Sequence, residues 1–416
     1  MNDQGGVGLV RVAGAVYRLA VLRDKPGRVA AALAHAKATV GHVECLCSSP
    51  PRRLVIRTNR KTGRYHVARW PGDLEHDGEC AFHRLDESLT GRSAYGGAAI
   101  VETEDGFSIR LSAPLTRVTA ERRTPTPRPR AVDADPRAPR RAVGLLGLLH
   151  LLLEESRLTV WRKGARDRGW GECVVALRRV AGMCQVTGGR ALGEVMYVVP
   201  RYTGRQDRDA GRQDGHGEGG FEEFFDRLRP SRASVPRGLM LGEIRDVRPA
   251  KYNVAYHLAN HAAPVFVAPD LDRAARASYP AAFAEAGRAA GGRRLALLLV
   301  ERASEKNLRV VDMAVALTTA HRIPVDSSLE LVMADALVSH GRGFVKPLRF
   351  DAAHEVVLPD FILTDTEPHI PVEVYGVRGR EAYDQRKAEK EAIYRAAGQF
   401  VVTWDGRGKL PDLTVR

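Results

Sequence analysis

The sequence lacks the features of an exported or membrane-spanning protein. No stretch reaches the roughly 20 apolar residues that a spanning helix needs, and the nearest candidate, GLLGLLHLLL at 144–153, is about half that length. The N-terminal MNDQGGVGLVRV has neither a basic start nor a long apolar run, so we find no secretion signal. We therefore expect a cytoplasmic protein with no membrane partner, in which residues 144–153 form a buried helix.

Cysteine is scarce, and its odd count of five in a chain without an export signal argues against a disulfide framework. A CxC pair and, after 28 intervening residues, an HxxxC pair instead suit a closed tetrahedral Zn²⁺ site of the structural type. The four predicted ligands are Cys45, Cys47, His76 and Cys80. Unrelated buried cysteines are the alternative, and His83 is an alternative ligand. We interpret Cys173 and Cys184, in a segment of helical pattern, as core residues.

Composition indicates a folded protein of several domains with a polyanionic partner. A chain of 416 residues exceeds one ordinary core, and 44% hydrophobic with 27% charged residues is typical of globular proteins. Its 64 Lys and Arg against 50 Asp and Glu give a net charge of +14, which favours phosphate contacts. A GC-rich genome would also raise the arginine content, so charge alone does not decide the matter.

The pattern along the chain predicts an α/β multidomain protein. Short β-rich runs at 52–58, 64–70 and 106–112 precede an arginine- and proline-rich stretch that cannot form a core. Apolar runs at 239–244 and 294–300 later indicate strands of a mixed α/β region. We divide the chain into a β-rich domain with the zinc ligands (1–118), a linker (119–142), a helical domain (143–200), a flexible loop (201–222), a mixed α/β domain (223–325) and a C-terminal domain (326–416).

The C-terminal domain carries the most informative order of elements. Apolar residues at helical spacing predict a helix in SSLELVMADALVSH, and Gly398 is suited to end a second helix. Three apolar runs predict strands. In chain order the elements are a helix (327–340), a strand (355–363), a strand (370–375), a helix (381–398) and a strand (399–404).

This α-β-β-α-β order, with Pro359-Asp360 before Phe361 and Glu373 thirteen positions after Asp360, resembles the PD-(D/E)XK nuclease superfamily. The resemblance implies a restriction-endonuclease-like core in which Asp360 and Glu373 hold Mg²⁺ or Mn²⁺. It also implies an additional metal-binding carboxylate at Glu330 on the preceding helix.

The sequence departs from the superfamily motif at Tyr375, which stands where the motif has lysine. Many members take the lysine from the following helix instead, and this chain has two lysines and two tyrosines on one face of that helix. These residues are Tyr383, Lys387, Lys390 and Tyr394. Either lysine is a candidate for the catalytic positive charge.

Two carboxylates, a hard cation and a lysine are the groups that phosphodiester hydrolysis requires. The cation polarises the phosphoryl oxygen and lowers the pKa of bound water, and the lysine stabilises the added negative charge of the transition state. We therefore predict a metal-dependent nuclease that acts on nucleic acid, with DNA favoured. The alternative is a non-catalytic nucleic-acid-binding protein of a mobile element with a degenerate nuclease fold.

Structural interpretations of the same residues remain open. Ser327 and Glu330 also form a capping box, which satisfies backbone amides at a helix start without any metal. Pro359-Asp360 is also common as a turn. Glu373 differs from these, because a carboxylate between Val372 and Val374 is costly to bury without a partner.

Three segments resemble a second family that covers most of the chain. They are YHVARWPGDLEHDGECAFH, HLLLEESRLTVW and the PDF and VEVYG segments of the C-terminal domain. The family is an uncharacterised bacterial one, domain of unknown function 1173, often carried on plasmids and other mobile elements. It has no established activity, so the nuclease prediction rests on the C-terminal residues.

Overall fold

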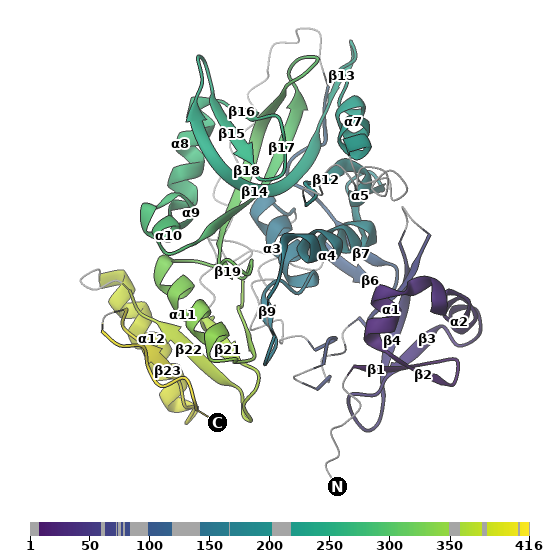
Figure 1. Ribbon diagram of the computed structural model, residues 1–416, viewed down its shortest axis with the longest axis vertical. Coiled ribbons are helices and arrows are strands. Elements are labelled where there is room, and N and C mark those ends of the chain that lie inside the picture. The colour runs from purple at the N-terminus through teal and green to yellow at the C-terminus, as the bar shows by residue number, and fades with distance from the viewer. Residues whose placement is uncertain are drawn as a thin grey trace.

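Several mixed and antiparallel sheets, covered by helices, make up the described part of the chain (Figure 1). The structure is a computed structural model. It describes residues 8–59, 63–71, 73, 76–77, 80–83, 99–118, 142–165, 167–201, 218–348, 358–376, 381–406 and 408–415. Within these ranges no helix combines the length and apolar character that crossing a bilayer requires.

The N-terminal unit is a five-stranded antiparallel sheet packed against two helices. In sheet order the strands are β2 (Ala15–Arg18), β1 (Leu9–Val12), β3 (His42–Cys45), β4 (Arg52–Thr58) and β5 (Tyr65–Arg69). The strands expected at 52–58 and 64–70 are thus confirmed. The prediction missed the helices α1 (Leu19–Asp24) and α2 (Pro26–Thr39). Alanine fills much of α2, which weakens its apolar periodicity, and its two larger apolar residues, Val29 and Leu33, are buried.

A second sheet joins segments from both sides of the predicted linker. Its strands are β11 (Arg190–Ala191), β10 (Cys184–Val186), β7 (Gly106–Ile109) and β6 (Ile100–Thr103). The short helix α5 (Leu192–Val195) follows β11. A further small pairing, β8 (Thr116–Val118) with β13 (Ser234–Pro236), also crosses the predicted boundaries. One sheet thus combines strands from residues 1–118 and 143–200. Linker residues 119–141 lie outside the described residues.

The central sheet has seven strands. They are β12 (Met196–Val198), β14 (Gly238–Pro249), β15 (Val254–Leu258), β16 (Val265–Val267), β18 (Leu308–Thr318), β17 (Arg293–Arg302) and β19 (Pro324–Val325). β14 pairs with β17 as well as with β15, so the pairings close into a ring. The strands expected at 239–244 and 294–300 are confirmed.

Helices cover the central sheet. They are α3 (Leu145–Glu155), α4 (Trp170–Met183), α7 (Glu218–Arg227), α8 (Pro269–Ser278), α9 (Pro280–Phe283) and α10 (Glu285–Ala289). The helix α3 packs on β17 and β18 and is almost wholly buried, which explains why its sequence is apolar all round. The helix α7 begins inside the predicted loop 201–222, of which residues 202–217 lie outside the described residues.

The C-terminal sheet follows the predicted order with two additions. Its strands are β23 (Val402–Trp404), β22 (Ile370–Val374), β21 (Phe361–Leu363), β20 (Phe344–Val345) and β9 (Val160–Trp161), and its helices are α11 (Ser328–Ser339) and α12 (Glu381–Ala396). β20 lies between α11 and β21 in the chain, and β9 comes from the middle of the chain to the edge of the sheet. The predicted helices and strands occur in this order, but β21 covers only the end of the strand expected at 355–363, whose residues 355–357 lie outside the described residues, and β23 covers only the second half of the strand expected at 399–404. Gly398 has the positive φ expected of a helix-ending glycine.

Candidate functional site

The C-terminal sheet places Asp360 and Glu373 on neighbouring strands. Phe361 of β21 pairs with Val372 of β22, so Asp360 stands opposite Glu373. One carboxylate oxygen of Asp360, Oδ2, accepts a hydrogen bond from the Val374 amide at 2.8 Å. The other, Oδ1, has no hydrogen-bond partner among the described residues. Glu373 is fully buried and Asp360 is partly exposed, so the pair joins an enclosed acid to an accessible one.

The buried carboxylate of Glu373 is held by two side chains of α12. Lys390 donates from Nζ to Glu373 Oε2 at 2.7 Å, and Tyr394 donates its hydroxyl to Oε1 at 2.7 Å. Lys390 also donates to the carbonyl of Leu358 at 2.7 Å. Burial, followed by the charge of Asp360, raises the pKa of Glu373 to about 7, although Lys390 and Tyr394 oppose this rise. Glu373 therefore has the partners that its burial requires.

The second candidate lysine, Lys387, lies away from these acids. Its Nζ is 4.3 Å from the ring centroid of Tyr375 and 3.7 Å from Glu391 Oε1. The tyrosine in the position of the motif lysine thus contacts Lys387 by a cation–π interaction, while Lys390, one turn further along α12, reaches Glu373. Of the two lysines, only Lys390 contacts an acid of the predicted site.

Glu330 lies in the first turn of α11, which Ser327 caps, and is close enough to Asp360 for the two charges to interact. Ser327 Oγ accepts from the Glu330 amide at 3.1 Å, so the capping interpretation is correct for the serine. Glu330 Oε2 accepts from the Asp326 amide at 3.0 Å and lies 2.9 Å from Lys346 Nζ. Burial raises the pKa of Glu330, and the charges of Asp326 and Asp360 raise it further. The charge of Lys346 opposes this rise. Helix capping and a place beside the acids are therefore compatible roles.

Lys346, directly after β20, and Asp326 are the two members of this cluster that the sequence analysis missed. A signal was available, because a lysine between Val345 and Pro347 in an apolar segment needs partners as much as Glu373 does. We define the residues that contact or electrically influence one another here as the C-terminal charge cluster. They are Asp326, Glu330, Lys346, Asp360, Glu373, Lys390 and Tyr394.

The carboxylates of the charge cluster suit a hard cation by chemistry. Asp360 Oδ1 and Glu330 Oε1 have no hydrogen-bond partner among the described residues, whereas both oxygens of Glu373 are bound. The three acids do not form a compact ligand set. Within the described ranges, the one group of three or more acidic, histidine or cysteine side chains that could hold an ion is the cysteine–histidine cluster of the N-terminal unit.

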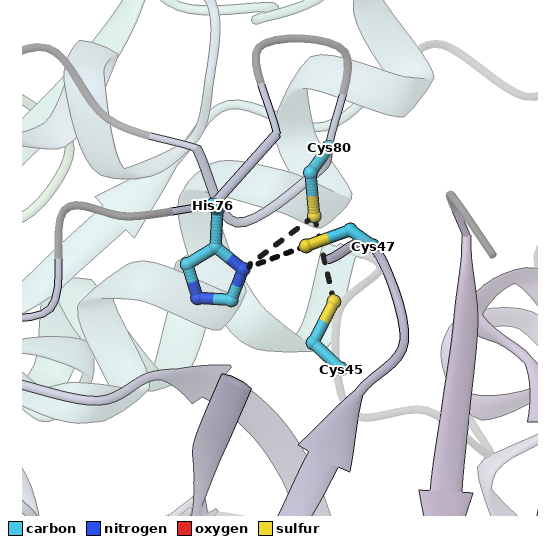
Figure 2. Close-up of side chains that lie close together, drawn as sticks. All are labelled: Cys45, Cys47, His76 and Cys80. Atoms are coloured by element: carbon cyan, nitrogen blue, oxygen red, sulfur yellow. Dashed lines mark hydrogen bonds between the residues drawn. The ribbon is translucent and has the colours of Figure 1, made fainter. Parts of the chain in front are cut away.

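The cysteine–histidine cluster consists of Cys45, Cys47, His76 and Cys80, all buried, with ligand atoms within 4.8 Å of one another (Figure 2). Cys45 Sγ is 3.5 Å from Cys80 Sγ, and His76 Nδ1 is 3.3 Å from Cys47 Sγ and 3.7 Å from Cys80 Sγ. Tetrahedral zinc with Zn–S bonds of about 2.3 Å places its sulfurs about 3.8 Å apart. The cluster is therefore compatible with a structural zinc ion. His83 instead directs Nδ1 to the carbonyl of His76 at 3.1 Å.

In the absence of metal, Cys80 is the thiol of this cluster that ionises most readily. The hydrogen bond between Cys45 and Cys80 lowers the pKa of Cys80 to about 4, despite burial, and raises the pKa of Cys45. The Phe82 amide also donates to Cys80 Sγ at 3.4 Å. Burial raises the pKa of Cys47. Ionising all three thiols therefore requires further positive charge, which a divalent ion supplies.

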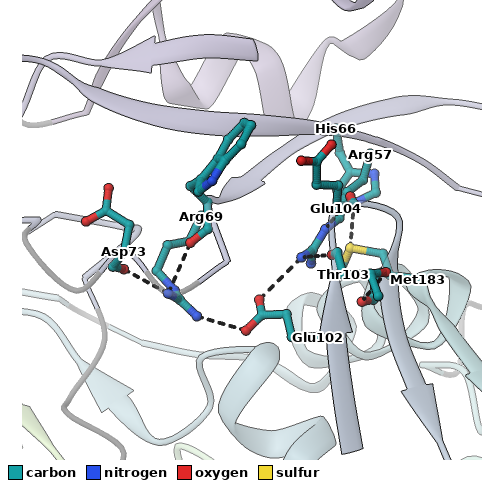
Figure 3. Close-up of polar contacts among 10 residues, drawn as sticks. Arg57, His66, Arg69, Asp73, Glu102, Thr103, Glu104 and Met183 are labelled. Carbon is teal, nitrogen blue, oxygen red and sulfur yellow. Dashed lines mark hydrogen bonds and ion pairs between the residues drawn. The ribbon is translucent and has the colours of Figure 1, made fainter. Parts of the chain in front are cut away.

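A network of arginines connects this unit to the second sheet (Figure 3). Arg69 donates to Glu102 Oε2 at 3.0 Å and to the carbonyl of Asp73 at 2.8 Å. Asp73 Oδ2 lies 3.9 Å from His76 Nε2, on the side of the ring away from the sulfurs. The buried Arg57 also reaches Glu102, at 3.3 Å. The contacts of His76 thus continue, through Asp73 and Arg69, to the second sheet.

The comparisons with known proteins give a family. The sequence model of the family described as protein of unknown function (DUF1173) matches residues 17–406. The chain belongs to this family. No curated protein and no solved structure matches the chain. The DUF1173 match spans both the cysteine–histidine cluster and the C-terminal charge cluster.

Of the predicted residues, the structure brings together two sets within the DUF1173 region. Cys45, Cys47, His76 and Cys80 converge, and Asp360, Glu373 and Lys390 converge with Glu330 nearby. Lys387 does not join them. Cys173 and Cys184 are buried core residues, as expected.

Proposed function

We propose that this protein is a metal-dependent nuclease that hydrolyses phosphodiester bonds of nucleic acid, with DNA favoured. The observation that carries the proposal is the contact of Lys390 with the buried Glu373 beside Asp360. The sequence offers Lys387 or Lys390 as the source of the catalytic positive charge, and Lys390 is the one beside this acid pair. A binding-only protein has no evident need for an ammonium held against a buried carboxylate beside a second, accessible acid.

The order of elements supports the proposal. α11, β21, β22, α12 and β23 follow in the α-β-β-α-β order of the resemblance, and β22 pairs with β23 in parallel. The resemblance to PD-(D/E)XK nucleases rests on this order and on the residues themselves. Lys390 of α12 provides the lysine that the motif has at the position of Tyr375.

The chain's own residues have distinct parts in the proposed reaction. Asp360 and Glu373 would hold Mg²⁺ or Mn²⁺, with Glu330 assisting. The ion, when bound, supplies Lewis acidity and a more acidic water. Lys390 places a positive charge beside the scissile phosphate, and Tyr394 orients Glu373 through its hydroxyl.

A second candidate function is nucleic-acid binding without cleavage. It is favoured by one observation, that both oxygens of Glu373 already have partners and the acids do not form a compact ligand set. The net charge of +14 suits either function.

We further propose that Cys45, Cys47, His76 and Cys80 hold one structural zinc ion. Their spacing and burial support this.

The experiment that tests the proposed function is incubation of the purified protein with plasmid and linear DNA in Mg²⁺, Mn²⁺ or EDTA. The proposal expects cleavage in either metal and none in EDTA. Binding of DNA without cleavage in any metal would replace the nuclease with the binding-only protein.

A further inference from the structure

Five strands of the central sheet form a closed barrel. Four of them lie in the spatial order β17, β14, β15 and β16, which is that of a Greek key, and β18 closes the ring between β16 and β17. Five-stranded Greek-key barrels bind oligonucleotides or oligosaccharides on the face of the second and third strands and at the loops beside it. In this chain that face consists of β15, β16 and the loops 250–253 and 303–307. The barrel alone does not identify a ligand, so the residues on this face must.

The two loops share a cavity with β16 and β18. It has a volume of about 270 Å³, and its lining residues are Asn253, Phe266, Ala303, Ser304, Asn307 and Arg309. The first loop is closed by a hydrogen bond from the Ala250 amide to the Asn253 carbonyl at 2.8 Å. The second is closed by one from the Ala303 amide to the Asn307 carbonyl at 2.9 Å. The side-chain amides of Asn253 and Asn307 have no hydrogen-bond partner within the described ranges, so both can bind a ligand.

Two aromatic rings belong to this face. Tyr252 is 76% exposed in the first loop, and Lys251 Nζ lies 5.1 Å from its ring centroid. Phe266 lies between the buried Val265 and Val267 on β16, so its side chain points away from the barrel core and lines the cavity. Among the described residues, Phe266 joins no hydrophobic cluster. Accessible rings stack on the bases of a single strand, whereas the bases of a duplex are already stacked on one another.

The cavity also has an excess of positive charge. Glu301, whose side chain is 1% exposed, accepts hydrogen bonds from Arg237 at 2.8 Å and from Arg309. Its carboxylate also lies 3.5 Å from Arg117 Nε. Three guanidinium groups around one carboxylate give this group a net charge of +2. Arg309 is 54% exposed and lines the cavity, so its charge is accessible to a phosphate.

We propose that this face of the barrel binds single-stranded nucleic acid, with bases stacked on Tyr252 and Phe266 and a phosphate on Arg309. The inference rests on the proposed function and names the form of nucleic acid that the protein holds, an unpaired strand. Figure 1 shows β15 and β16 in the upper half of the molecule and β22 and α12 in the lower half. The barrel face is therefore separate from the C-terminal charge cluster, and its residues act on affinity and not on the chemical step.

The test is fluorescence anisotropy of a labelled oligothymidylate of about 15 nucleotides with the full chain, without added Mg²⁺ or Mn²⁺, over a series of salt concentrations. The wild type should bind this strand about tenfold more tightly than a duplex of equal length. Tyr252→Ala should lose about tenfold in affinity without a change of salt dependence, because it removes stacking and no charge. Arg309→Met should reduce the slope of log affinity against log salt by about 0.7, the value for one phosphate contact on a single strand.

Matched variants control for general effects on the protein. Tyr252→Phe keeps the ring and should keep the affinity. Phe400→Ala removes a side chain that is 60% exposed and lies two residues before β23, and it should also keep the affinity. Arg288→Met removes one positive charge from α10, which precedes β17, whereas the loop 303–307 follows β17. It should keep the salt slope of the wild type.

The outcomes separate the inference from the proposed function. Equal affinity for strand and duplex, or unchanged binding by both Tyr252→Ala and Arg309→Met, would overturn the inference, and plasmid cleavage by the same protein would leave the nuclease standing. Displacement of the labelled strand by the neutral oligosaccharide maltohexaose would assign the cavity to sugars and also overturn it. Strand binding with the expected variant effects, but without cleavage in any metal, would support the inference and overturn the nuclease. Absence of binding to strand and duplex at low salt would overturn both.

Discussion

At the scale of single residues, the charge cluster shows why buried charges mark a candidate site. Glu373 has no exposed surface and lies in an apolar strand, yet each of its oxygens has a donor within 2.7 Å. The sequence predicts that Glu373 needs a partner, because an unpaired buried carboxylate is costly. The sequence does not predict which lysine pairs with Glu373, because Lys387 and Lys390 lie on the same face of α12. Which of the two reaches Glu373 depends on how α12 packs against the sheet.

Lys390→Met should reduce the rate of DNA cleavage by about 100-fold, because it removes a positive charge placed to stabilise the transition state. The variant should also shift the pH profile of cleavage to higher pH, since Lys390 lowers the pKa of Glu373. Steady cleavage rates across a pH series measure both effects. Lys387→Met is the control. Equal losses in the two variants would remove the special role of Lys390.

His66 should make the protein less stable in acid. Burial, followed by the charges of Arg179, Arg57 and Lys37, lowers the pKa of His66 to about 3 in the folded protein. The unfolded chain binds this proton near pH 6.5, so between pH 6.5 and 3 the unfolded state holds more protons and stability falls as pH falls. The contribution is at most about 1.4 kcal/mol per pH unit.

His66→Gln should therefore reduce the slope of the free energy of unfolding against pH between pH 6.5 and 4. Urea unfolding at several pH values measures this slope. A variant with the slope of the wild type would contradict the assignment of the acid sensitivity to His66.

At the scale of elements, periodicity and turn residues predicted most of what surrounds the two sites. The helix α11 and the strands β4, β5, β14 and β17 lie at the residues where their apolar patterns predict them. The residues of the cysteine–histidine cluster were also found from spacing alone, because tetrahedral ligation constrains both residue type and separation.

What the sequence did not predict is pairing between distant segments. β9 and β20 are two residues each, too short for a recognisable alternation of apolar residues. They are strands because they pair with each other and β20 pairs with β21. The pairing of β7 with β10 is likewise long-range. Sheets therefore combine segments from both sides of the boundaries drawn along the chain, and Lys346 was missed together with β20.

Zinc should be bound at one ion per chain and should stabilise the N-terminal unit. Cys80→Ser removes the sulfur that contacts both Cys45 and His76, so the variant should lose zinc and unfold at lower temperature. Metal analysis of protein purified without chelators, with thermal unfolding, measures this. Cys173→Ser, in the core of α4, is the control that keeps zinc. Full zinc content in Cys80→Ser would contradict the ligand set.

At the scale of the whole molecule, the two candidate sites lie in different parts of the chain, and the net charge of +14 is a property of all of it. Figure 1 shows the N-terminal unit and the C-terminal sheet at opposite lower corners, with the central sheet above. Among the described residues, no hydrogen bond or ion pair joins the cysteine–histidine cluster to the acids for which we propose a role in cleavage. We assign it to stability and the charge cluster to chemistry.

DNA binding should weaken steeply with salt and show little sequence preference. On the proposed function, dispersed arginines would contact phosphates and release counterions, so affinity should fall by about tenfold or more between about 50 and about 200 mM salt. Fluorescence anisotropy with duplexes of unrelated sequence measures this. An affinity that does not change with ionic strength would contradict the nucleic-acid partner.

The most direct test of the account is the rate of plasmid cleavage by Asp360→Asn in Mg²⁺. Asparagine keeps an oxygen that can accept from the Val374 amide but removes the charge that the ion requires, so folding and DNA binding should persist. We predict that cleavage falls by about 1,000-fold or more, as expected when the ion is lost from the transition state. Cleavage by Asp360→Asn at the rate of the wild type would contradict the account.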